Sequence, residues 1–428
     1  MNNAGPQRIA VIGSGISGLA AAYFLSRKHE VHLFEKDCRL GGHTHTHLIE
    51  DPATGRILPV DTGFIVHNDR TYPNLVRLFA ELGIATQASD MSFGVSCRQT
   101  GFEYSSRGLS GFFAQRSNLL RPSHYGFFRE LMRFNREAPK LLESPAHPSI
   151  TLGEYLERER FSREFTNRYL YPMSAAVWST SPGQMRDFPA GTLIRFFDNH
   201  GFLGINTHPK WKTLIGGSHT YIPKLTAAYL DRIHTGAQIR AVQRNEHSVT
   251  LQFQNRTAQE FDQIVFATHG DQVLPLLDTP TSAEGEVLGA FRTSRSRTWL
   301  HTDNSVLPKR VPAQASWNYH VHTESTADLA TTGVTVTYDM NRLQAIDSPT
   351  RFCVTLNALE GIDERKVLRR MEYAHPLYTI ESVRAQARWN EISGKNRTHF
   401  CGAYWFYGFH EDGLNSALRV ARALGVEW

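Results

Sequence analysis

The segment RIAVIGSGISGLAAAYFLS, which begins at residue 8, most constrains what this chain can fold into. Residues 8–12 predict a short buried strand, and residues 19–26 predict an apolar helix. Between them Gly13, Gly15 and Gly18 stand at G-x-G-x-x-G spacing. The first glycine permits a tight turn, the second lets the backbone approach a phosphate, and the third allows helix and strand to pack closely. Because the helix start presents unpaired N–H groups to an anion, the segment predicts a pyrophosphate site.

An acidic residue stands where a dinucleotide-binding segment needs one. A second strand is predicted at residues 31–34, and it ends in Glu35, 22 residues after Gly13. An acidic side chain about 20 residues beyond the glycines accepts hydrogen bonds from an adenosine ribose. An ordinary glycine-rich turn would leave this spacing unexplained. The motif predicts a dinucleotide site and leaves NAD and FAD open.

The length and composition indicate a folded protein of two domains. The chain has 428 residues, 41% of them hydrophobic, with 25 Phe and 15 Tyr. No apolar run approaches the roughly 18–20 residues needed to span a bilayer. The start, MNNAGPQ, lacks the basic and apolar regions of a secretory signal, so a cytoplasmic location is expected. The four cysteines show no C-x-x-C pair or zinc spacing and are interpreted as reduced thiols: Cys38, Cys97, Cys353 and Cys401.

The positive charge is concentrated in residues 105–140. Against Glu130 and Glu137, this stretch carries seven basic residues, a net +5 (7 − 2) that equals the formal charge of the chain. The seven are Arg107, Arg116, Arg121, Arg129, Arg133, Arg136 and Lys140. Interleaved Phe and Leu residues make the pattern typical of helices on an anionic membrane surface, a peripheral membrane location. A solvated face over an ordinary core is the alternative. No nucleic-acid-binding motif accompanies the charge, so nucleic acid is not an expected partner.

The alternation of strands and helices predicts how the chain is divided. It recurs near the start, middle and end, which predicts an α/β fold with one nucleotide-binding domain built from separated segments. Residues 1–70, 211–280 and 396–428 are assigned to that domain. An inserted α+β substrate domain takes residues 71–210, mostly helical, and residues 281–395, which carry the strands of a further sheet.

Further glycine-rich and terminal motifs add to the first. Arg39 precedes the pair Gly41-Gly42, which allows a close backbone approach to a phosphate that the arginine neutralises. A second glycine turn follows at residues 61–63, and residues 266–269 close a buried strand. Near the end of the chain, residues 410–414 predict a helix start with N–H groups free to face an anion.

Taken together, these motifs resemble the flavin-containing amine oxidase superfamily, which includes monoamine oxidases, protoporphyrinogen oxidase and carotenoid desaturases. The resemblance covers the nucleotide-binding portions of the chain. The remainder is similar to bacterial NAD/FAD-binding proteins often encoded beside cyclopropane-fatty-acid synthase. The matching pieces are WNY at residues 317–319, VTYDMNRLQ from Val336, VTLN from Val354 and GFHEDGL from Gly408.

The resemblance implies bound FAD, held by a Rossmann-like domain of amine oxidase type. The expected cofactor-binding residues are Gly13, Ser14, Gly15, Ile16, Ser17, Gly18, Glu35, Lys36, Arg39, Gly41, Gly42, His43, Thr62, Gly63, Phe64, Ile239, Thr268, Gly402, Ala403, Glu411, Asp412, Gly413 and Leu414. In this set the helix start at residues 411–414 faces the flavin pyrimidine. The chain departs from the family twice. His43 stands where an arginine is common, and Ala403 stands where a carboxylate often follows the glycine.

The predicted chemistry is hydride transfer from a substrate C–H bond to the flavin, for which the protein positions the bond and excludes water. The aromatic run at residues 404–407 indicates a slot for this, with Tyr404 as the substrate-facing residue; packing in the core is the alternative. His67 and His410 are candidate proton-handling residues, although buried histidines are more often structural. His43, His45 and His47 alternate along one strand face, but they lack acidic or cysteine partners at suitable spacing, so no metal is expected.

Three functions remain open at this point. The first is an FAD-dependent oxidoreductase that abstracts hydride from a small-molecule or lipid substrate, with a fatty acyl chain preferred. The second is a flavin amine oxidase, and the third is a non-catalytic flavin-binding partner of a lipid-modifying enzyme. The electron acceptor and the oligomeric state are not readable from the sequence.

Overall fold

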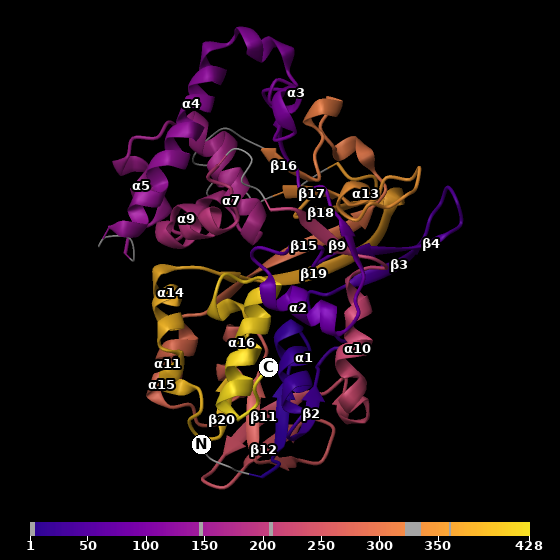
Figure 1. The fold of residues 1–428 in the computed structure, drawn as a ribbon, viewed down its shortest axis with the longest axis vertical. Helices are drawn as coiled ribbons and strands as arrows, with labels where there is room; N and C mark the ends of the chain where they lie inside the picture. Colours follow the sequence, from indigo (N-terminus) through magenta and orange to yellow (C-terminus); the bar gives the residue numbers. More distant parts are fainter. Residues whose placement is uncertain (1–4, 145–148, 205–208, 322–334, 359–360) are drawn as a thin grey trace.

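The computed structural model describes residues 5–144, 149–204, 209–321, 335–358 and 361–428. Two parts are stacked along the long axis of the molecule (Figure 1). The lower part contains both chain ends and the sheet whose strand at residues 8–12 leads into the glycine motif. The upper part contains most of the helices between residues 108 and 199 and the largest sheet.

The lower part is built on a five-stranded parallel sheet. Its strand order is β10 (Ile233–His234), β2 (Glu30–Phe34), β1 (Arg8–Ile12), β14 (Gln263–Phe266) and β20 (Thr398–Phe400). Strands from the start, middle and end of the chain are therefore neighbours, as predicted for a nucleotide-binding unit assembled from separated segments. Helices α1 (Ile16–Leu25) and α16 (His410–Ala423) pack against each other beside this sheet (Figure 1). Helix α1 is apolar and buried over nearly its whole length, so it belongs to the core.

Three helices that the predicted boundaries assign to the substrate domain pack in the lower part. Helices α11 (Ser282–Gly289), α14 (Ile380–Ala387) and α15 (Trp389–Ile392) bury apolar side chains in the same core as β1 and β14. The predicted boundaries place these helices in the substrate domain. Their packing differs from that prediction because their apolar faces meet the core of the five-stranded sheet.

The upper part contains a seven-stranded mixed sheet. Its order is β19 (Val367–Leu377), β15 (Arg292–His301), β18 (Cys353–Leu356), β17 (Thr335–Asp339), β16 (Trp317–Val321), β7 (Phe93–Cys97) and β8 (Phe102–Ser105). Five of these strands, β15 to β19, lie within residues 281–395, where the sequence predicts a further sheet. Only the contact between β16 and β7 is parallel among the described pairings of this sheet.

Helices pack over this sheet, as the helical pattern between residues 108 and 200 predicts. They include α3 (Gly108–Phe112), α4 (Pro122–Glu137), α5 (Leu152–Arg158), α7 (Tyr171–Trp178) and α9 (Ala190–Asn199). Phe134, Phe165 and Phe197 are fully buried in the second hydrophobic core with the sheet residues. Helices α3 and α4 project at the end of the molecule farthest from the nucleotide-binding sheet (Figure 1). Across the described parts of the chain, every helix is too short or too polar to cross a membrane.

Smaller elements join the two parts. Strands β3 (Thr46–Glu50) and β4 (Ile57–Asp61) form a hairpin, and β5 (Val66–Asn68), β9 (Trp211–Leu214) and β6 (Thr86–Ala88) form a three-stranded sheet. Helix α2 (Pro73–Glu81) contacts α16. A further three-stranded sheet, β11 (Ile239–Arg244), β12 (Val249–Phe253) and β13 (Gln259–Phe261), lies in the lower part (Figure 1).

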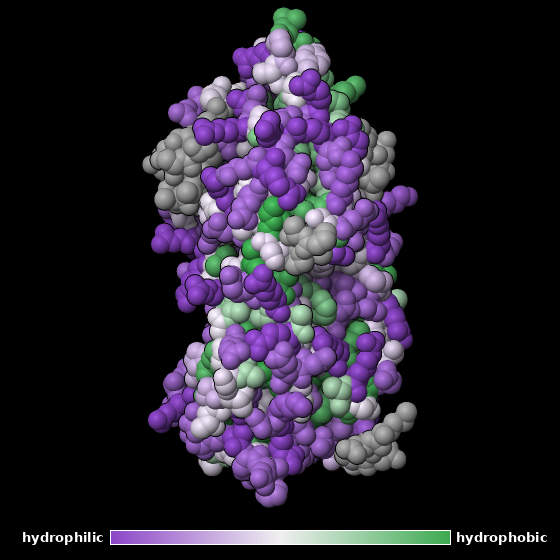
Figure 2. All heavy atoms as spheres, turned by 90° about the vertical axis from the view of Figure 1, so that its left-hand side faces the viewer, coloured by the Kyte–Doolittle hydropathy of each residue, from purple (hydrophilic) through white to green (hydrophobic). Residues whose placement is uncertain are grey.

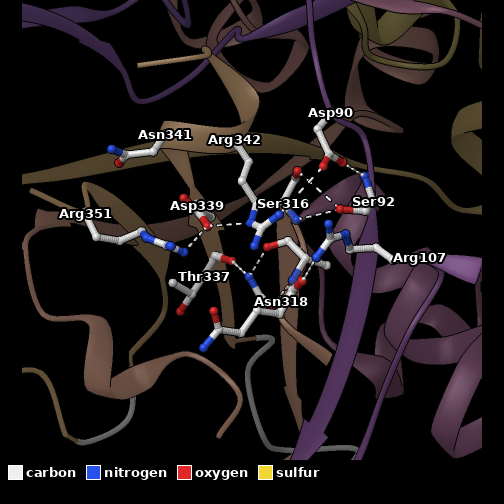
Figure 3. A network of polar contacts seen from close by, with 12 residues as sticks. Asp90, Ser92, Arg107, Ser316, Asn318, Thr337, Asp339, Asn341, Arg342 and Arg351 are labelled. Carbon is white, nitrogen blue, oxygen red and sulfur yellow. Dashed lines mark hydrogen bonds and ion pairs between the residues drawn. The ribbon is translucent and has the colours of Figure 1, made fainter. Parts of the chain in front are cut away.

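The motifs WNY and VTYDMNRLQ meet in a buried polar network at one end of β16 and β17 (Figure 3). Arg342 Nε and Arg351 Nη1 donate to Asp339 Oδ2 at 3.0 and 2.6 Å. The side-chain amide of Asn318 donates to the carbonyls of Ala315 and Thr337 at 2.6 and 3.2 Å. The network fixes the end of the sheet, which is a structural role for these motifs.

Candidate functional site

A cavity of about 710 Å³ opens at the carboxyl ends of β1, β2 and β14. Ligands of open α/β sheets bind at this edge. The residues predicted from the sequence that line it are Gly13, Ser14, Gly15, Ile16, Ser17, Glu35, Lys36, Arg39, Gly42, His43, Ile239, Thr268, Gly402, Ala403, Tyr404 and His410. The cavity therefore unites the start, the middle and the end of the chain.

The three glycines of the first motif have the separate roles that their spacing predicts. Gly13 has a φ of +100°, and a Cβ there would lie 2.9 Å from the carbonyl oxygen of Ala267. A Cβ at Gly18 would collide with the carbonyl oxygen of Gly13, which accounts for the close packing of α1 on β1. At Gly15 a Cβ would meet no protein atom within 4 Å, because this glycine faces the cavity.

The start of α1 is arranged to receive an anion. Gly15 is its N-cap residue and supplies no side-chain hydrogen bond to the helix, and the first turn carries no acidic residue. The Gly41-Gly42 turn closes over this helix start, since Gly41 N–H donates to the Ser14 carbonyl at 3.0 Å. A Cβ at Gly42 would come within 3.0 Å of Gly15 Cα. These contacts leave the N–H groups of the helix start beside the cavity, as a pyrophosphate requires.

Glu35 connects the acidic end of β2 to this turn. Its Oε2 accepts hydrogen bonds from the Ser14 N–H at 2.9 Å and the Ser14 hydroxyl at 2.6 Å. Its Oε1 accepts from the Asp37 N–H at 2.9 Å. An ionised carboxylate offers about four acceptor positions, so one remains for a ligand hydroxyl. Ile239 and Gln254 line the same end of the cavity.

Elsewhere along the cavity, three buried polar atoms have no partner among the described residues: His43 Nε2, His375 Nδ1 and the Tyr404 hydroxyl. All three residues line the cavity. The His43 ring lies 5.2 Å from that of His375 and 5.8 Å from that of His269. Burial lowers the pKa of His375 to about 4 and that of His43 well below its ordinary value, so both are neutral at pH 7. Unpaired buried polar atoms are rare in native proteins, and these fit a ligand that supplies hydrogen bonds.

His410 is the residue of the terminal motif that reaches the cavity. Helix α16 begins here, within the segment 410–414 that the sequence predicts as a helix start. The His410 ring stacks on Phe64 with 3.7 Å between ring centroids, and Nε2 lies 3.0 Å from Thr44 Oγ1. Burial lowers the pKa of His410 to about 3.

The side chains of the next residues of α16 have structural roles, and these residues do not line the cavity. The Glu411 carboxylate accepts from the N–H groups of Asn74 and Leu75 at 3.1 and 2.8 Å and so caps helix α2. A Cβ at Gly413 would come within 2.7 Å of Ile16, so this glycine lets α16 approach α1. The remaining two, Asp412 and Leu414, are absent from the cavity lining as well. Of α16 only His410 lines the cavity, and the approach of the backbone N–H groups of this helix start to a flavin stays a prediction.

Several other predicted cofactor-binding or catalytic residues lie outside the cavity lining. Gly18, Gly41, Thr62, Gly63, Phe64 and His67 do not line the cavity. Thr62 Oγ1 hydrogen-bonds with the hydroxyl of Tyr373, which does line it. His67 is buried on β5 with its ring edge against Phe79, so the structure does not place it to act on a substrate in this cavity.

The cavity wall formed by β19 is not predicted from the sequence. Tyr373, Ala374, His375 and Pro376 line the cavity, although they stand more than 330 residues beyond Gly42. No local motif marks this strand, because its role depends on how the upper part sits on the lower one. Phe409 was missed as well, and it also lines a second cavity of about 370 Å³ together with Tyr407, Glu411 and Asp412.

The residues present fit FAD in each of its parts. The end near Glu35 and Ile239 suits an adenosine, and the helix start at Gly15 suits a pyrophosphate. The end near His43, His375 and Tyr404 suits the hydrogen-bonding edge of a flavin. All four cysteines are free, and Cys401 is buried with a raised pKa. Within the described ranges, no three His, Cys, Asp or Glu side chains are grouped to hold a metal ion.

Comparisons with known proteins agree with this site. Residues 16–425 match the family of flavin containing amine oxidoreductases. The search for similar sequences among curated proteins returned no match. Among solved structures, putrescine oxidase bound to putrescine has a TM-score of 0.71 at 15% identity, with 98% of this chain and 99% of that chain covered.

Two further solved structures share the fold. The CLA-producing fatty acid isomerase from P. acnes has a TM-score of 0.70 at 14% identity, with 98% of this chain and 99% of that chain covered. Cyclohexylamine oxidase from Brevibacterium oxydans IH-35A has a TM-score of 0.68 at 15% identity, with 98% of each chain covered. The family match spans nearly the whole sequence. This chain belongs to the flavin-containing amine oxidoreductase family and is an FAD-dependent oxidoreductase.

Proposed function

We propose that this enzyme abstracts hydride from a carbon of an uncharged substrate, with a fatty acyl or lipid chain as the substrate class. The observation that carries the proposal is the neutral state of three histidines that line the cavity. His43, His375 and His410 are buried imidazoles with lowered pKa values, and Tyr404 and Phe409 are the aromatic residues beside them. No ionised side chain is needed there to receive an uncharged C–H donor.

FAD, when bound, supplies the hydride acceptor for this reaction. The chain supplies the surroundings. Tyr404 and Phe409 exclude water, and the unpaired Nδ1 of His375 offers a hydrogen-bonding position inside the cavity. Loss of hydride from an alkyl carbon makes the neighbouring C–H strongly acidic, so even a weakly basic neutral imidazole can take the second proton. We assign that role to His375 and a contact role to Tyr404.

Two further observations support a lipid substrate. The motifs around Trp317 and Val336 resemble bacterial proteins encoded beside cyclopropane-fatty-acid synthase, a resemblance that belongs to this proposal. One solved structure of the same fold is named as a fatty acid isomerase. A cytoplasmic enzyme that works at the inner membrane surface would meet such chains directly.

A flavin amine oxidase is the second candidate, and the smaller cavity favours it. Glu411 and Asp412 line that cavity. Acidic side chains beside Phe409 would attract a cationic amine toward the larger cavity. Putrescine oxidase and cyclohexylamine oxidase are named for such substrates.

Anaerobic titration of the purified enzyme distinguishes the candidates. Flavin absorbance is followed while dispersed fatty acyl lipids or simple amines are added. Bleaching by acyl lipids supports the proposal, and bleaching by amines alone would overturn the substrate assignment. A flavin that no donor reduces would favour a non-catalytic partner role. His375→Asn should slow reduction by the productive donor and change its pH profile, whereas His247→Asn, at an exposed site, should not.

A further inference from the structure

We propose that the projecting end of the upper part docks onto an anionic lipid bilayer. This surface, called the tip, comprises α3, the 3₁₀ turn η1 (Arg116–Leu120) and the first three turns of α4. It forms one extremity of the molecule (Figure 1), and in Figure 2 that extremity carries hydrophobic side chains among hydrophilic ones. The proposal goes beyond the proposed function and does not depend on which substrate the enzyme oxidises.

The tip exposes large apolar side chains that a soluble surface would bury. Leu120 is 89% exposed and Leu109 is 78% exposed, and Leu119 is about half exposed. They stand on neighbouring segments of one projection rather than scattered over the molecule. Single exposed leucines are ordinary, but an apolar group of this kind on a projection marks an interaction site.

Helix α4 extends this apolar group with one of its faces. Tyr125, Phe128 and Met132 follow at helical spacing and are all exposed. The opposite face, with Phe127 and Phe134, is buried against the second core. The core therefore accounts for one apolar face of the helix. On the outer face, Phe128 and Tyr125 contact the rings of Phe112 and Phe113 on one side and remain exposed on the other.

The charges of the tip indicate that its partner is anionic. Glu137 pairs with Arg136 and Lys140, and Glu130 lies 3.8 Å from Arg133. Both acidic residues of the segment are thus engaged toward the far end of α4. Nearer the exposed leucines, Arg116, Arg121 and Arg129 are exposed and form no ion pair with any described residue.

An anionic bilayer surface has a charged headgroup layer over an apolar acyl layer. The tip offers unpaired arginines to the first and protruding leucines to the second. The arginines meet lipid phosphates and carboxylates, while the leucines and aromatic rings enter the acyl boundary about 5–10 Å deep. A nucleic acid would satisfy the arginines but offers no apolar layer for Leu120. A protein partner would need a complementary concave surface, whereas a fluid bilayer adapts to a convex projection.

The test is co-sedimentation of the full-length, FAD-loaded enzyme with lipid vesicles. One set of vesicles is pure phosphatidylcholine, and the other contains phosphatidylglycerol in addition. The enzyme should bind the anionic vesicles and release them in about 0.5 M salt, where surface electrostatics are screened. Equal binding to both vesicle types, or no binding to either, would overturn the proposal.

Two independent sets of variants locate the surface. Arg116→Glu, Arg121→Glu and Arg129→Glu together should weaken binding to anionic vesicles by about 100-fold or more. Leu119→Ser with Leu120→Ser should weaken it by about 10-fold, because less apolar area is buried. The matched charge control is Arg256→Glu, Lys395→Glu and Arg422→Glu, all exposed and in the lower part.

The controls also separate this proposal from the substrate assignment. Leu230→Ser removes an exposed leucine elsewhere and should leave vesicle binding unchanged. Tip variants should keep the flavin spectrum and the rate of flavin reduction by a donor dispersed in detergent. If the charge control weakens vesicle binding as much as the tip variants do, the tip is not the docking surface.

Discussion

Asp61 and Gln344 join the two parts of the molecule through a pair of hydrogen bonds. The Asp61 N–H donates to Gln344 Oε1 at 2.8 Å, and Gln344 Nε2 donates to Asp61 Oδ2 at 2.8 Å. The same carboxylate accepts from the N–H and the hydroxyl of Ser218. Three segments far apart in sequence are therefore held by one buried carboxylate. Gln344 is the last residue of the VTYDMNRLQ motif, so this joint explains its identity.

Replacement of Gln344 by alanine should lower the free energy of unfolding by about 1–3 kcal/mol, the cost of leaving a buried acceptor and donor unpaired. Denaturant unfolding followed by circular dichroism measures the change. Gln99→Ala, at an exposed position, is the matched control and should cost little. Equal stabilities of Q344A and the unmodified enzyme would contradict the role of the joint.

Replacement of Glu35 by alanine should weaken FAD binding by about 10–100-fold. The variant removes the acceptor for two Ser14 hydrogen bonds and the group assigned to the ribose, and hydrogen bonds to charged groups contribute about 1.5–3 kcal/mol. FAD titration of apoprotein by fluorescence quenching measures the affinity. Glu30→Gln, at the exposed start of the same strand, should bind FAD normally. A Glu35→Ala variant with unaltered affinity would remove Glu35 from the site.

The glycines of the first motif offer a matched pair of substitutions. Gly15→Ala should fold, because its Cβ meets open space, but it should bind FAD weakly because the methyl group enters the phosphate position. Gly18→Ala should fold poorly, since its Cβ would collide with the Gly13 carbonyl. Soluble yield, thermal unfolding and FAD content distinguish the two. The reverse pattern would contradict the roles given to these glycines.

Stability should fall as the pH is lowered from 7 toward 4. His301 is fully buried, and burial lowers its pKa to about 4 from an unfolded value of about 6.5. On acidification the unfolded state binds this proton first. The stabilisation of the fold by the neutral ring is therefore complete above pH 6.5, decreases as the pH is lowered, and is lost once the pH has fallen through 4. At pH 5 this residue alone costs about 2 kcal/mol.

Chemical denaturation at several pH values checks the acid sensitivity. His301 Nε2 lies 2.8 Å from Thr355 Oγ1, and His301→Gln keeps a hydrogen-bonding group at this position without a titrating ring. That variant should be less stable at pH 7 but should lose less stability on acidification. A variant with the same pH dependence as the unmodified enzyme would show that His301 does not titrate in this range.

The sequence predicts the first motif and its neighbours well because their chemistry is local. The roles of Gly13, Gly15 and Gly18 follow from a turn of fixed length, and the structure confirms their packing. The family assignment is confirmed as well. His375 could not be found this way, because it reaches the site only through the long pairing of β15 with β19. The side-chain contacts of Glu411 could not be predicted either, because its carboxylate caps a helix that no local pattern connects to it.

The FAD content of the purified enzyme, compared with that of two variants, tests the central claim most directly. If separated segments form one FAD site, the enzyme should carry close to one FAD per chain, identified by its absorption spectrum and by chromatography after denaturation. The variants Gly15→Ala, near the start of the chain, and Tyr373→Ala, on β19 in the cavity wall, should each lose most of the bound FAD. A colourless protein that takes up no added FAD, or full retention by both variants, would contradict the account.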